Sequence, residues 1–265
     1  MDKSIKNILV TGGLGFIGSS LINKLLNTTD KKIFNIDKCS YSSNKTSIER
    51  NLKNDTEGKQ KRYKFLNIDL YNFEETKRII LDVKPDIIFH LAAESHVDRS
   101  IKDPQNFVKS NVMGTYHLLE AARAHYISMD EMKKSFFKFI HISTDEVYGS
   151  LEEKGKFTEK SPYDPRSPYS ATKASSDHLV SSWWHTFKLP VVISNCSNNY
   201  GPWQFPEKLI PTIINKALNH QEIPIYGDGS NIRDWLHVED HIEALLEISK
   251  KGVVGEKYLI GGSSE

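Results

Sequence analysis

Three spaced glycines are the residues whose chemistry is easiest to foresee. The segment TGGLGFIG (11–18) follows the first apolar run of the chain and places Gly12, Gly15 and Gly18 just before a helical pattern. Without side chains, glycines permit a tight turn and let a phosphate approach the N–H groups at a helix N-terminus. The spacing therefore predicts a site for the pyrophosphate of a dinucleotide.

A carboxylate in the right place strengthens this prediction. Asp37 ends the next apolar run, about 20 residues on, where it can accept hydrogen bonds from an adenosine ribose. Because Asp37 would repel a 2′-phosphate, it favours NAD over NADP, and the neighbouring Lys38 weakens that discrimination.

A tyrosine and a lysine four residues apart form a second reactive pair. Tyr169 and Lys173 begin a predicted helix over 169–188, so both side chains project from one face. A free tyrosine has a pKa of about 10, and a nearby ammonium favours the phenolate, which can act as a base. The alternative is an ordinary exposed helix pair.

Two adjacent carboxylates follow a predicted strand at 136–142. Asp145 and Glu146 lie in the segment STDEVYG (143–149), and ligands of open α/β sheets bind at the carboxyl ends of strands. The pair is therefore suited to acid and base catalysis, although a solvated turn would also tolerate it.

Alternating elements must position these groups. Apolar runs of strand length are predicted at 5–10, 32–36, 63–68, 86–91, 136–142 and 191–195. Amphipathic helices are predicted between them at 16–26, 74–83, 105–125 and 169–188. This order predicts an α/β fold with a doubly wound parallel sheet of the Rossmann type.

Four further stretches complete the predicted organisation. The polar segment 39–61 reads as an exposed loop with room for a short helix, and 198–211 reads as a ligand-facing loop. A helix at 238–251 is expected to pack back on the sheet before a last strand at 256–260.

Composition excludes several classes of protein. The net charge of +1 predicts no nucleic-acid binding, and the densest basic run, 59–62, reads as a solvated loop. We expect no membrane helix and no signal peptide. Cys39 and Cys196 are far apart, which predicts a cytoplasmic protein without disulfides, and no histidine stands in metal-ligand spacing, so no metal site is expected.

These motifs resemble the dTDP-glucose 4,6-dehydratase family, extended short-chain dehydrogenases/reductases of the NAD-dependent epimerase/dehydratase superfamily. The matching segments are TGGLGFIGS (11–19), LAAESHVDRSI (91–101), STDEVYG (143–149), YSATKASSDHLV (169–180), NCSNNYGPWQFPEKLIP (195–211) and RDWLHVEDH (233–241). The triplet Thr144, Asp145 and Glu146 is typical of the dehydratases, because related epimerases usually carry small or hydroxyl residues there.

The resemblance implies a hydro-lyase that turns a nucleoside-diphosphate glucose, dTDP-glucose above all, into a 4-keto-6-deoxy sugar. Tyr169, aided by Thr144 and Lys173, would take the C4 hydroxyl proton while hydride passes to NAD. Glu146 would remove the C5 proton, Asp145 would protonate the departing C6 hydroxyl, and hydride would return to C6. Because elimination needs a base and an acid together, we expect the pKa values of the two carboxyl groups to be pushed apart.

The resemblance also implies a set of binding residues. Those expected to touch NAD are Gly12, Gly15, Phe16, Ile17, Gly18, Asp37, Lys38, Asp69, Leu70, Leu91, Ala92, Ala93, Ser95, Ser110, Ser143, Tyr169, Lys173 and Asn199. Those expected to touch the sugar nucleotide are Ser95, Thr144, Asn198, Lys208, Leu209, Pro224, Ile225, Tyr226 and Arg233. The two cations in this second set suit a pyrophosphate.

Domain organisation and partners follow from the same resemblance. We expect a NAD-binding domain over 1–195, a partial substrate lobe over 196–265, and a homodimer formed through the helices at 105–125 and 169–188. Family members usually continue for many tens of residues beyond this point, so the substrate lobe is expected to be incomplete here. Two other functions stay open: a sugar-nucleotide 4-epimerase, and a non-catalytic protein that binds NAD or a sugar nucleotide.

Overall fold

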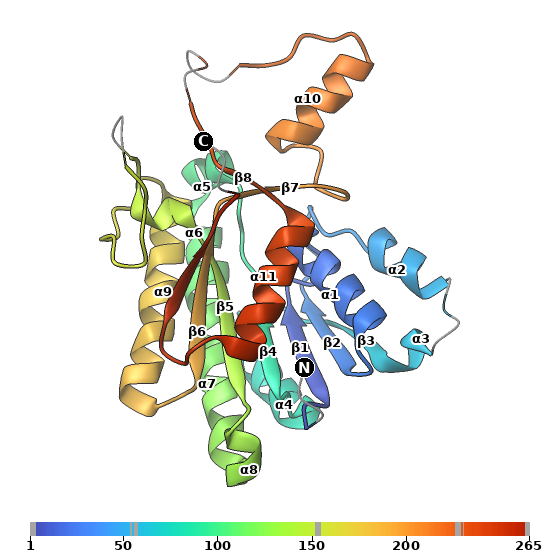
Figure 1. Ribbon diagram of the computed structural model, residues 1–265, viewed down its shortest axis with the longest axis vertical. Coiled ribbons are helices and arrows are strands. Elements are labelled where there is room, and N and C mark those ends of the chain that lie inside the picture. The colour runs from blue at the N-terminus through green and yellow to red at the C-terminus, as the bar shows by residue number, and fades with distance from the viewer. Residues whose placement is uncertain are drawn as a thin grey trace.

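A seven-stranded sheet, in which all neighbouring strands run parallel, organises the chain (Figure 1). The computed structural model describes residues 4–53, 55, 58–151, 155–225, 229 and 231–262. The strand order is β3-β2-β1-β4-β5-β6-β9. The strands are β1 (Asn7–Thr11), β2 (Lys32–Asp37), β3 (Tyr63–Asn67), β4 (Ile87–His90), β5 (Lys138–Thr144), β6 (Val191–Cys196) and β9 (Lys257–Ile260).

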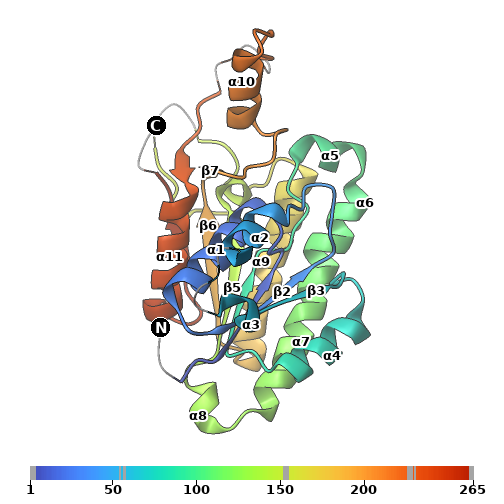
Figure 2. The ribbon, with the colours of Figure 1, turned by 90° about the vertical axis from the view of Figure 1, so that its right-hand side faces the viewer.

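Helices cover both faces of this sheet (Figures 1 and 2). α1 (Phe16–Thr28) and α11 (Val238–Lys251) pack on one face, and α4 (Phe73–Val83), α7 (Gly114–Ser128) and α9 (Pro168–Phe187) pack on the other. Side chains alternate along β1, since Ile8 and Val10 join the first core and Leu9 joins the second. Both faces are therefore buried, which explains the continuous apolar strands and confirms the predicted doubly wound sheet.

The polar stretch at 39–61 forms two short helices, α2 (Thr46–Lys53) and α3 (Lys59–Arg62). The segment 59–62, predicted as a solvated loop, is thus helical, although none of its residues is buried. The Arg62 guanidinium donates hydrogen bonds to the carbonyl oxygens of Leu26, Thr29 and Lys31, at 2.9–3.0 Å. A cation at this end of α1 satisfies carbonyl groups that the helix leaves unpaired.

The helix predicted at 105–125 contains a wider turn. It begins as α6 (Pro104–Phe107), after the short α5 (Val97–Lys102), continues through a π-helical segment η1 (Val108–Met113) and ends as α7. Within η1 the Asn111 carbonyl oxygen accepts hydrogen bonds from the hydroxyls of Thr115, at 2.5 Å, and Ser176, at 2.7 Å. Such bulges occur often at functional sites.

Strand β5 extends two residues beyond its predicted end, because Ser143 and Thr144 pair with Asn195 and Cys196 of β6. The predicted turn after β5 is a 3-10 helix, η2 (Asp145–Tyr148), while the short α8 (Glu131–Lys134) precedes the strand. Thr144 is therefore held by the sheet itself.

The expected loop at 198–211 also contains regular structure. β7 (Asn198–Tyr200) pairs in parallel with β8 (Trp235–His237), and α10 (Leu209–Leu218) stands away from the sheet (Figures 1 and 2). No residue of α10 is buried. Across the described ranges, no helix is both long enough and apolar enough to cross a membrane.

Candidate active site

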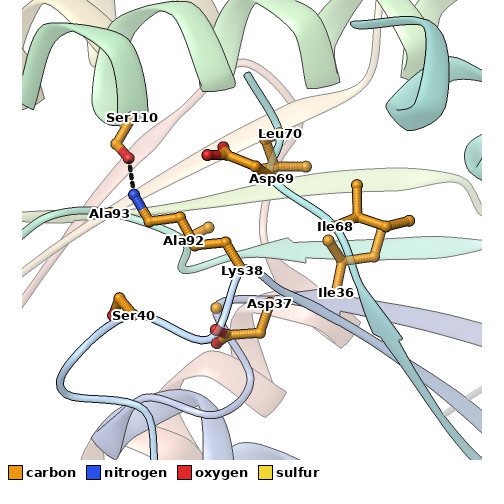
Figure 3. Close-up of a pocket in the computed structure, with 11 residues that line it drawn as sticks. Ile36, Asp37, Lys38, Ser40, Ile68, Asp69, Leu70, Ala92, Ala93 and Ser110 are labelled. Atoms are coloured by element: carbon orange, nitrogen blue, oxygen red, sulfur yellow. Dashed lines mark hydrogen bonds between the residues drawn. The ribbon is translucent and has the colours of Figure 1, made fainter. Parts of the chain in front are cut away.

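A pocket opens where the strand order reverses between β1 and β4, the position at which open α/β sheets bind ligands (Figure 3). The pocket is an open cleft, with about 440 Å³ of empty space that includes solvent at its mouth. The lining residues are Gly12, Ile36, Asp37, Lys38, Ser40, Ile68, Asp69, Leu70, Ala92, Ala93 and Ser110. Eight of these were predicted cofactor residues; Ile36, Ser40 and Ile68 were not, although each lies within two residues of a predicted one.

The glycine turn contributes Gly12 to the lining of this pocket. Gly12 has a φ of +69°, and a side chain there would lie 2.7 Å from the Ala92 Cα. A side chain on Gly18 would overlap the Gly12 carbonyl oxygen. Gly15 is the N-cap of α1, and no described side chain caps this end, so the N–H groups of Phe16 and Ile17 are available to a ligand.

Asp37 is held in place before any ligand binds. Its carboxylate accepts hydrogen bonds from the Leu14 and Cys39 N–H groups, at 2.9 and 2.8 Å, and from the Ser43 hydroxyl, at 3.0 Å. A carboxylate has about four lone-pair positions, so it can still accept from a ribose hydroxyl. Asp37 thus joins the glycine turn to the loop after β2.

Lys38 reaches across the pocket (Figure 3). Its ammonium donates to the Ser110 hydroxyl at 2.7 Å and pairs with the Glu94 carboxylate at 2.8 Å. The loop after β2 is thereby connected to the segment after β4 and to η1.

Asn111 positions the segment after β4, a role that the sequence did not reveal. Its side-chain oxygen accepts from the Glu94 N–H, at 2.8 Å, and its amide donates to the Glu94 carbonyl and the Thr172 hydroxyl, both at 3.0 Å. The predicted residues Leu91, Ala92, Ala93 and Ser95 lie in or beside this segment. An asparagine inside a helical pattern carries no local signal for such a contact.

The five predicted catalytic residues come from β5, η2 and the start of α9. Ser167 caps α9 and exchanges hydrogen bonds with Ser170, which orients the turn that carries Tyr169. The Lys173 ammonium donates to the Ile142 carbonyl of β5 at 2.8 Å. The predicted cofactor residue Ser143 follows Ile142 and is buried.

Tyr169 lies deeper than its predicted role as a ready phenolate suggests. Burial raises the pKa of Tyr169 well above its ordinary value, the Glu146 carboxylate raises it further, and a hydrogen bond with Thr144 lowers it. Burial also lowers the pKa of Lys173. Desolvation therefore opposes the ionisation of Tyr169 that the neighbouring Lys173 was expected to favour.

The two carboxyl groups have different surroundings. Burial raises the pKa of Asp145, and the negative charge of Asp234 raises it too, while its hydrogen bond from Thr144, at 3.2 Å, lowers it. Burial and Asp145 raise the pKa of Glu146.

The charges that oppose this rise act on Glu146. Lys208 and Arg233 both lower its pKa. Both carboxyl groups thus have raised pKa values, but the rise is opposed by cations at Glu146 and by hydrogen bonds at Asp145. Different surroundings of this kind are what a paired acid and base require.

The predicted substrate residues are less closely gathered. Lys208 is the N-cap of α10 and donates to the Ser95 carbonyl at 3.2 Å, while Leu209 starts α10 and is exposed. Asn198 and Asn199 lie on β7, where the Asn199 oxygen bonds His241 Nδ1 at 2.8 Å.

Other predicted substrate residues lie farther out. Arg233 is exposed and bonds the carbonyl of neighbouring Ile232. Pro224 and Ile225 are exposed and do not line the described pocket, and Tyr226 lies outside the described residues.

Comparison with known proteins gives consistent results. The family model described as GDP-mannose 4,6 dehydratase matches residues 9–264. The dTDP-glucose 4,6-dehydratase of Neisseria gonorrhoeae is 51% identical over 261 residues, which cover 98% of this chain and 74% of that protein.

Solved structures share the fold. The dTDP-glucose 4,6-dehydratase of Streptomyces venezuelae with NAD bound has a TM-score of 0.86 and 39% identity, over 97% of this chain and 76% of that one. A UDP-glucuronic acid 4-epimerase of Bacillus cereus has a TM-score of 0.83 and 33% identity, over 97% of this chain and 78% of that one. Because dehydratases and epimerases share this fold, the sequence identity is what separates them: the chain belongs to the dTDP-glucose 4,6-dehydratase family.

Proposed function

We propose that this protein is a NAD-dependent dTDP-glucose 4,6-dehydratase. The observation that carries the proposal is that Asp145 and Glu146, which directly follow β5, both act on the buried Tyr169, while Lys173 is bonded to β5 itself. An acid and a base beside a hydroxyl-activating pair is the set that water elimination from a sugar needs.

The residues present fit NAD. The uncapped start of α1 suits a pyrophosphate, and the pre-oriented Asp37 suits an adenosine ribose. Lys38 is already paired with Glu94, which offsets its attraction for a 2′-phosphate. When bound, NAD would supply a hydride acceptor for C4 and a hydride donor for C6.

The protein's own groups would move the protons. Tyr169 would take the C4 hydroxyl proton, with Thr144 and Lys173 beside it. Glu146 would take the C5 proton, which the C4 ketone makes acidic. Asp145 would donate a proton to the departing C6 hydroxyl, so that water leaves and a C5=C6 double bond forms. Once hydride has returned to C6, Glu146 would give its proton back to C5, which completes the 4-keto-6-deoxy sugar.

Charge supports a nucleoside-diphosphate sugar as substrate. Lys208 and Arg233 both act on Glu146, so two cations face the side of the site where a sugar pyrophosphate would lie. Asn198, Leu209, Pro224, Ile225 and Tyr226 remain predicted substrate residues. Thymine as the base is proposed from the dTDP-glucose enzymes to which the chain is similar.

The predicted division of the chain is kept as a proposal, with NAD bound by 1–195 and a partial substrate lobe in 196–265. α11 and β9 nevertheless pack with the sheet, so the lobe proper would be the part between β6 and α11. The cytoplasmic location stays a prediction.

A second copy of the chain would cover the outer face of α7 and α9. Tyr116 and Phe187 are exposed apolar side chains on these two helices, and both contact Trp183, with ring centroids 5.9 and 5.4 Å away. Light scattering should give the mass of a dimer, and Tyr116→Glu should shift it toward the monomer.

The epimerase alternative predicts a different product. It would use the same Tyr169 and Lys173 but needs no carboxylate pair, so Asp145 and Glu146 count against it. The decisive experiment incubates the NAD-loaded protein with dTDP-glucose and with UDP-glucose, and identifies each product by NMR. A 4-keto-6-deoxy sugar supports the dehydratase; a galacto product or unchanged substrate contradicts it.

A further inference from the structure

A buried carboxylate lies one helical turn beyond Lys173, on the same face of α9. Asp177 is only 1% exposed. Its Oδ2 accepts hydrogen bonds from the Tyr163 hydroxyl, at 2.9 Å, and from the Asn195 amide, at 3.0 Å, while its Oδ1 lies 3.1 Å from His141 Nε2. Hydrogen bonds from two separate parts of the chain therefore hold this carboxylate in place, with His141 beside it.

The groups around Asp177 are uncharged, with one exception. Burial and the charge of Lys173 lower the pKa of His141 to about 4 despite the adjacent Asp177, so His141 is neutral near pH 7. Burial likewise lowers the pKa of His90, whose ring centroid is 5.2 Å from that of His141.

The hydroxyl and thiol groups nearby are neutral as well. Burial raises the pKa of Tyr148 to about 12 and also raises the pKa of Tyr163. Burial raises the pKa of the Cys196 thiol, which faces Lys173 from β6, to about 12. Among the described residues that face Asp177, Lys173 is therefore its cationic partner.

Lys173 needs such a partner. Its residue is 4% exposed, and the acceptor found for its ammonium is the uncharged Ile142 carbonyl. A buried ammonium without a counter-charge loses its proton readily, because desolvation penalises the charged form. Burial lowers the pKa of Lys173, and Asp177 raises it.

We propose that Asp177 is a positioning residue that keeps the Lys173 ammonium charged beside Tyr169, so that the proton-abstracting pair works as a buried triad along one face of α9. The inference rests on the proposed function, which assigns Tyr169 and Lys173 their roles.

The spacing of the three residues along α9 decides which of the two charges acts more strongly on Tyr169. Lys173 is one helical turn from Tyr169, about 6 Å along the axis, and Asp177 is two turns away, about 12 Å. Because the nearer charge acts more strongly, the positive charge of Lys173 outweighs the negative charge of Asp177 at Tyr169. Without Asp177, Lys173 would become neutral at lower pH and would give Tyr169 no help.

The direct test follows Lys173 by NMR in the full 265-residue chain labelled with ¹³Cε-lysine. The Lys173 signal is assigned by its loss in Lys173→Met. Removal of the negative charge in the near-isosteric Asp177→Asn should lower the Lys173 titration midpoint by about one pH unit or more. An unchanged midpoint would overturn the proposal.

Two further variants separate charge from packing. Tyr163→Phe removes one hydrogen bond to Asp177 but keeps the carboxylate, so the Lys173 midpoint should stay within a few tenths of a unit. Asp177→Glu keeps the charge and should bring the midpoint back toward the wild-type value. If Tyr163→Phe shifts it as much as Asp177→Asn does, packing is the cause and the inference fails.

If Asp177→Asn does not fold, the electrostatic coupling between Lys173 and Asp177 can be measured on Asp177 instead. Electrostatic coupling is reciprocal, so Lys173→Met should raise the titration midpoint of Asp177, followed with ¹³Cγ-aspartate. An Asp177 midpoint that does not move would contradict the inference equally.

Turnover then shows whether the coupling matters for the reaction. Lys173 must be protonated, so a lower pKa should move the alkaline limb of the pH–rate profile to lower pH in Asp177→Asn, with recovery in Asp177→Glu. The NMR titrations need no turnover. Absence of a 4-keto product in wild type would thus defeat the proposed function alone, and an unchanged midpoint would defeat this inference alone.

Discussion

The carboxyl ends of the sheet strands and the segment between β6 and α11 supply functional groups to the same site but hold them differently. At the strand ends, Asp37 has three hydrogen-bond donors and Lys173 is anchored to β5. In the other segment, Arg233 bonds its own neighbour and α10 buries no residue. The sheet therefore fixes the groups that handle hydride and protons, whereas the nucleotide-facing groups depend on few contacts.

Those few contacts are specific. The Tyr41 hydroxyl, in the loop after β2, donates to the Glu207 carboxylate at 2.7 Å, and Arg99 lies 3.6 Å from the same carboxylate. Lys208, the next residue, reaches the Ser95 carbonyl. Changes at the strand ends should therefore abolish chemistry or cofactor binding, and changes in the outer segment should alter affinity with little effect on folding.

The largest effect is expected at the strand end that carries the base. Glu146→Gln keeps the size of the side chain but cannot take the C5 proton, so formation of the 4-keto product should fall by about 10²–10⁴-fold. NAD content, measured after denaturation, should be unchanged. The control Glu74→Gln alters an exposed carboxylate and should leave both values intact; near-normal turnover of Glu146→Gln would refute the base assignment.

The glycine turn should be the next most sensitive place. In Gly18→Ala the new methyl would overlap the Gly12 carbonyl and lie 2.8 Å from the Gly13 Cα. Overpacking of this kind costs about 1–3 kcal/mol of unfolding free energy. Urea melts should show that loss, and added NAD should no longer stabilise the variant as it does wild type. Ser20→Ala on the same helix is the control, and equal NAD stabilisation in both variants would contradict the assignment of the turn.

A smaller and different effect is expected from the outer segment. Lys208→Met removes the proposed charge-assisted contact with the substrate pyrophosphate. Such a contact is worth about 1.5–3 kcal/mol, so KM should rise roughly 10–100-fold. Lys208 lowers the pKa of Glu146, whose ionised form is the base. Its loss should therefore raise that pKa and move the acid limb of kcat/KM to higher pH.

The matched control is Lys216→Met, on the same helix, for which KM and the acid limb should both stay at wild-type values. A change in kcat at the pH optimum, with KM unchanged, would mean that Lys208 acts on the chemistry and not on substrate binding.

The smallest effect should come from the tip of α10. Leu218 is 76% exposed, so Leu218→Ser should change the unfolding free energy by no more than about 0.5 kcal/mol. A loss well above 1 kcal/mol in a urea melt would show that α10 packs on the body, and the contrast between the two regions would disappear.

The same contrast separates what the sequence could predict from what it could not. The glycine turn, Asp37 and the pair Tyr169 and Lys173 depend on local spacing, which periodicity reveals. The π-helical segment depends on a hydroxyl from Ser176, a residue 65 positions after Asn111, which no local pattern contains.

The pKa values of the site residues were the second feature that the sequence could not predict. The direction of the Tyr169 pKa shift follows from the burial of its side chain, which only the folded chain creates. Asp177, by contrast, carried an available signal, because it continues the four-residue spacing of Tyr169 and Lys173 along the buried face of α9. The sequence allowed one short helix in 39–61, where the structure has α2 and α3. α10 was missed because Pro211, which lies in its first turn, was read as a sign of irregular structure.

The π-helical segment has a consequence for how the chain tolerates changes in length. A π turn is equivalent to one extra residue in an α-helix, and each residue advances an α-helix by about 100°. Deletion of a single residue from η1 would rotate α5 and α6 by that angle relative to α7 and carry Ser110 out of line with Lys38. The position of Ser110 in the pocket wall thus depends on the number of residues in η1. We expect η1 to tolerate insertions and deletions less well than the connection between α10 and β8 does.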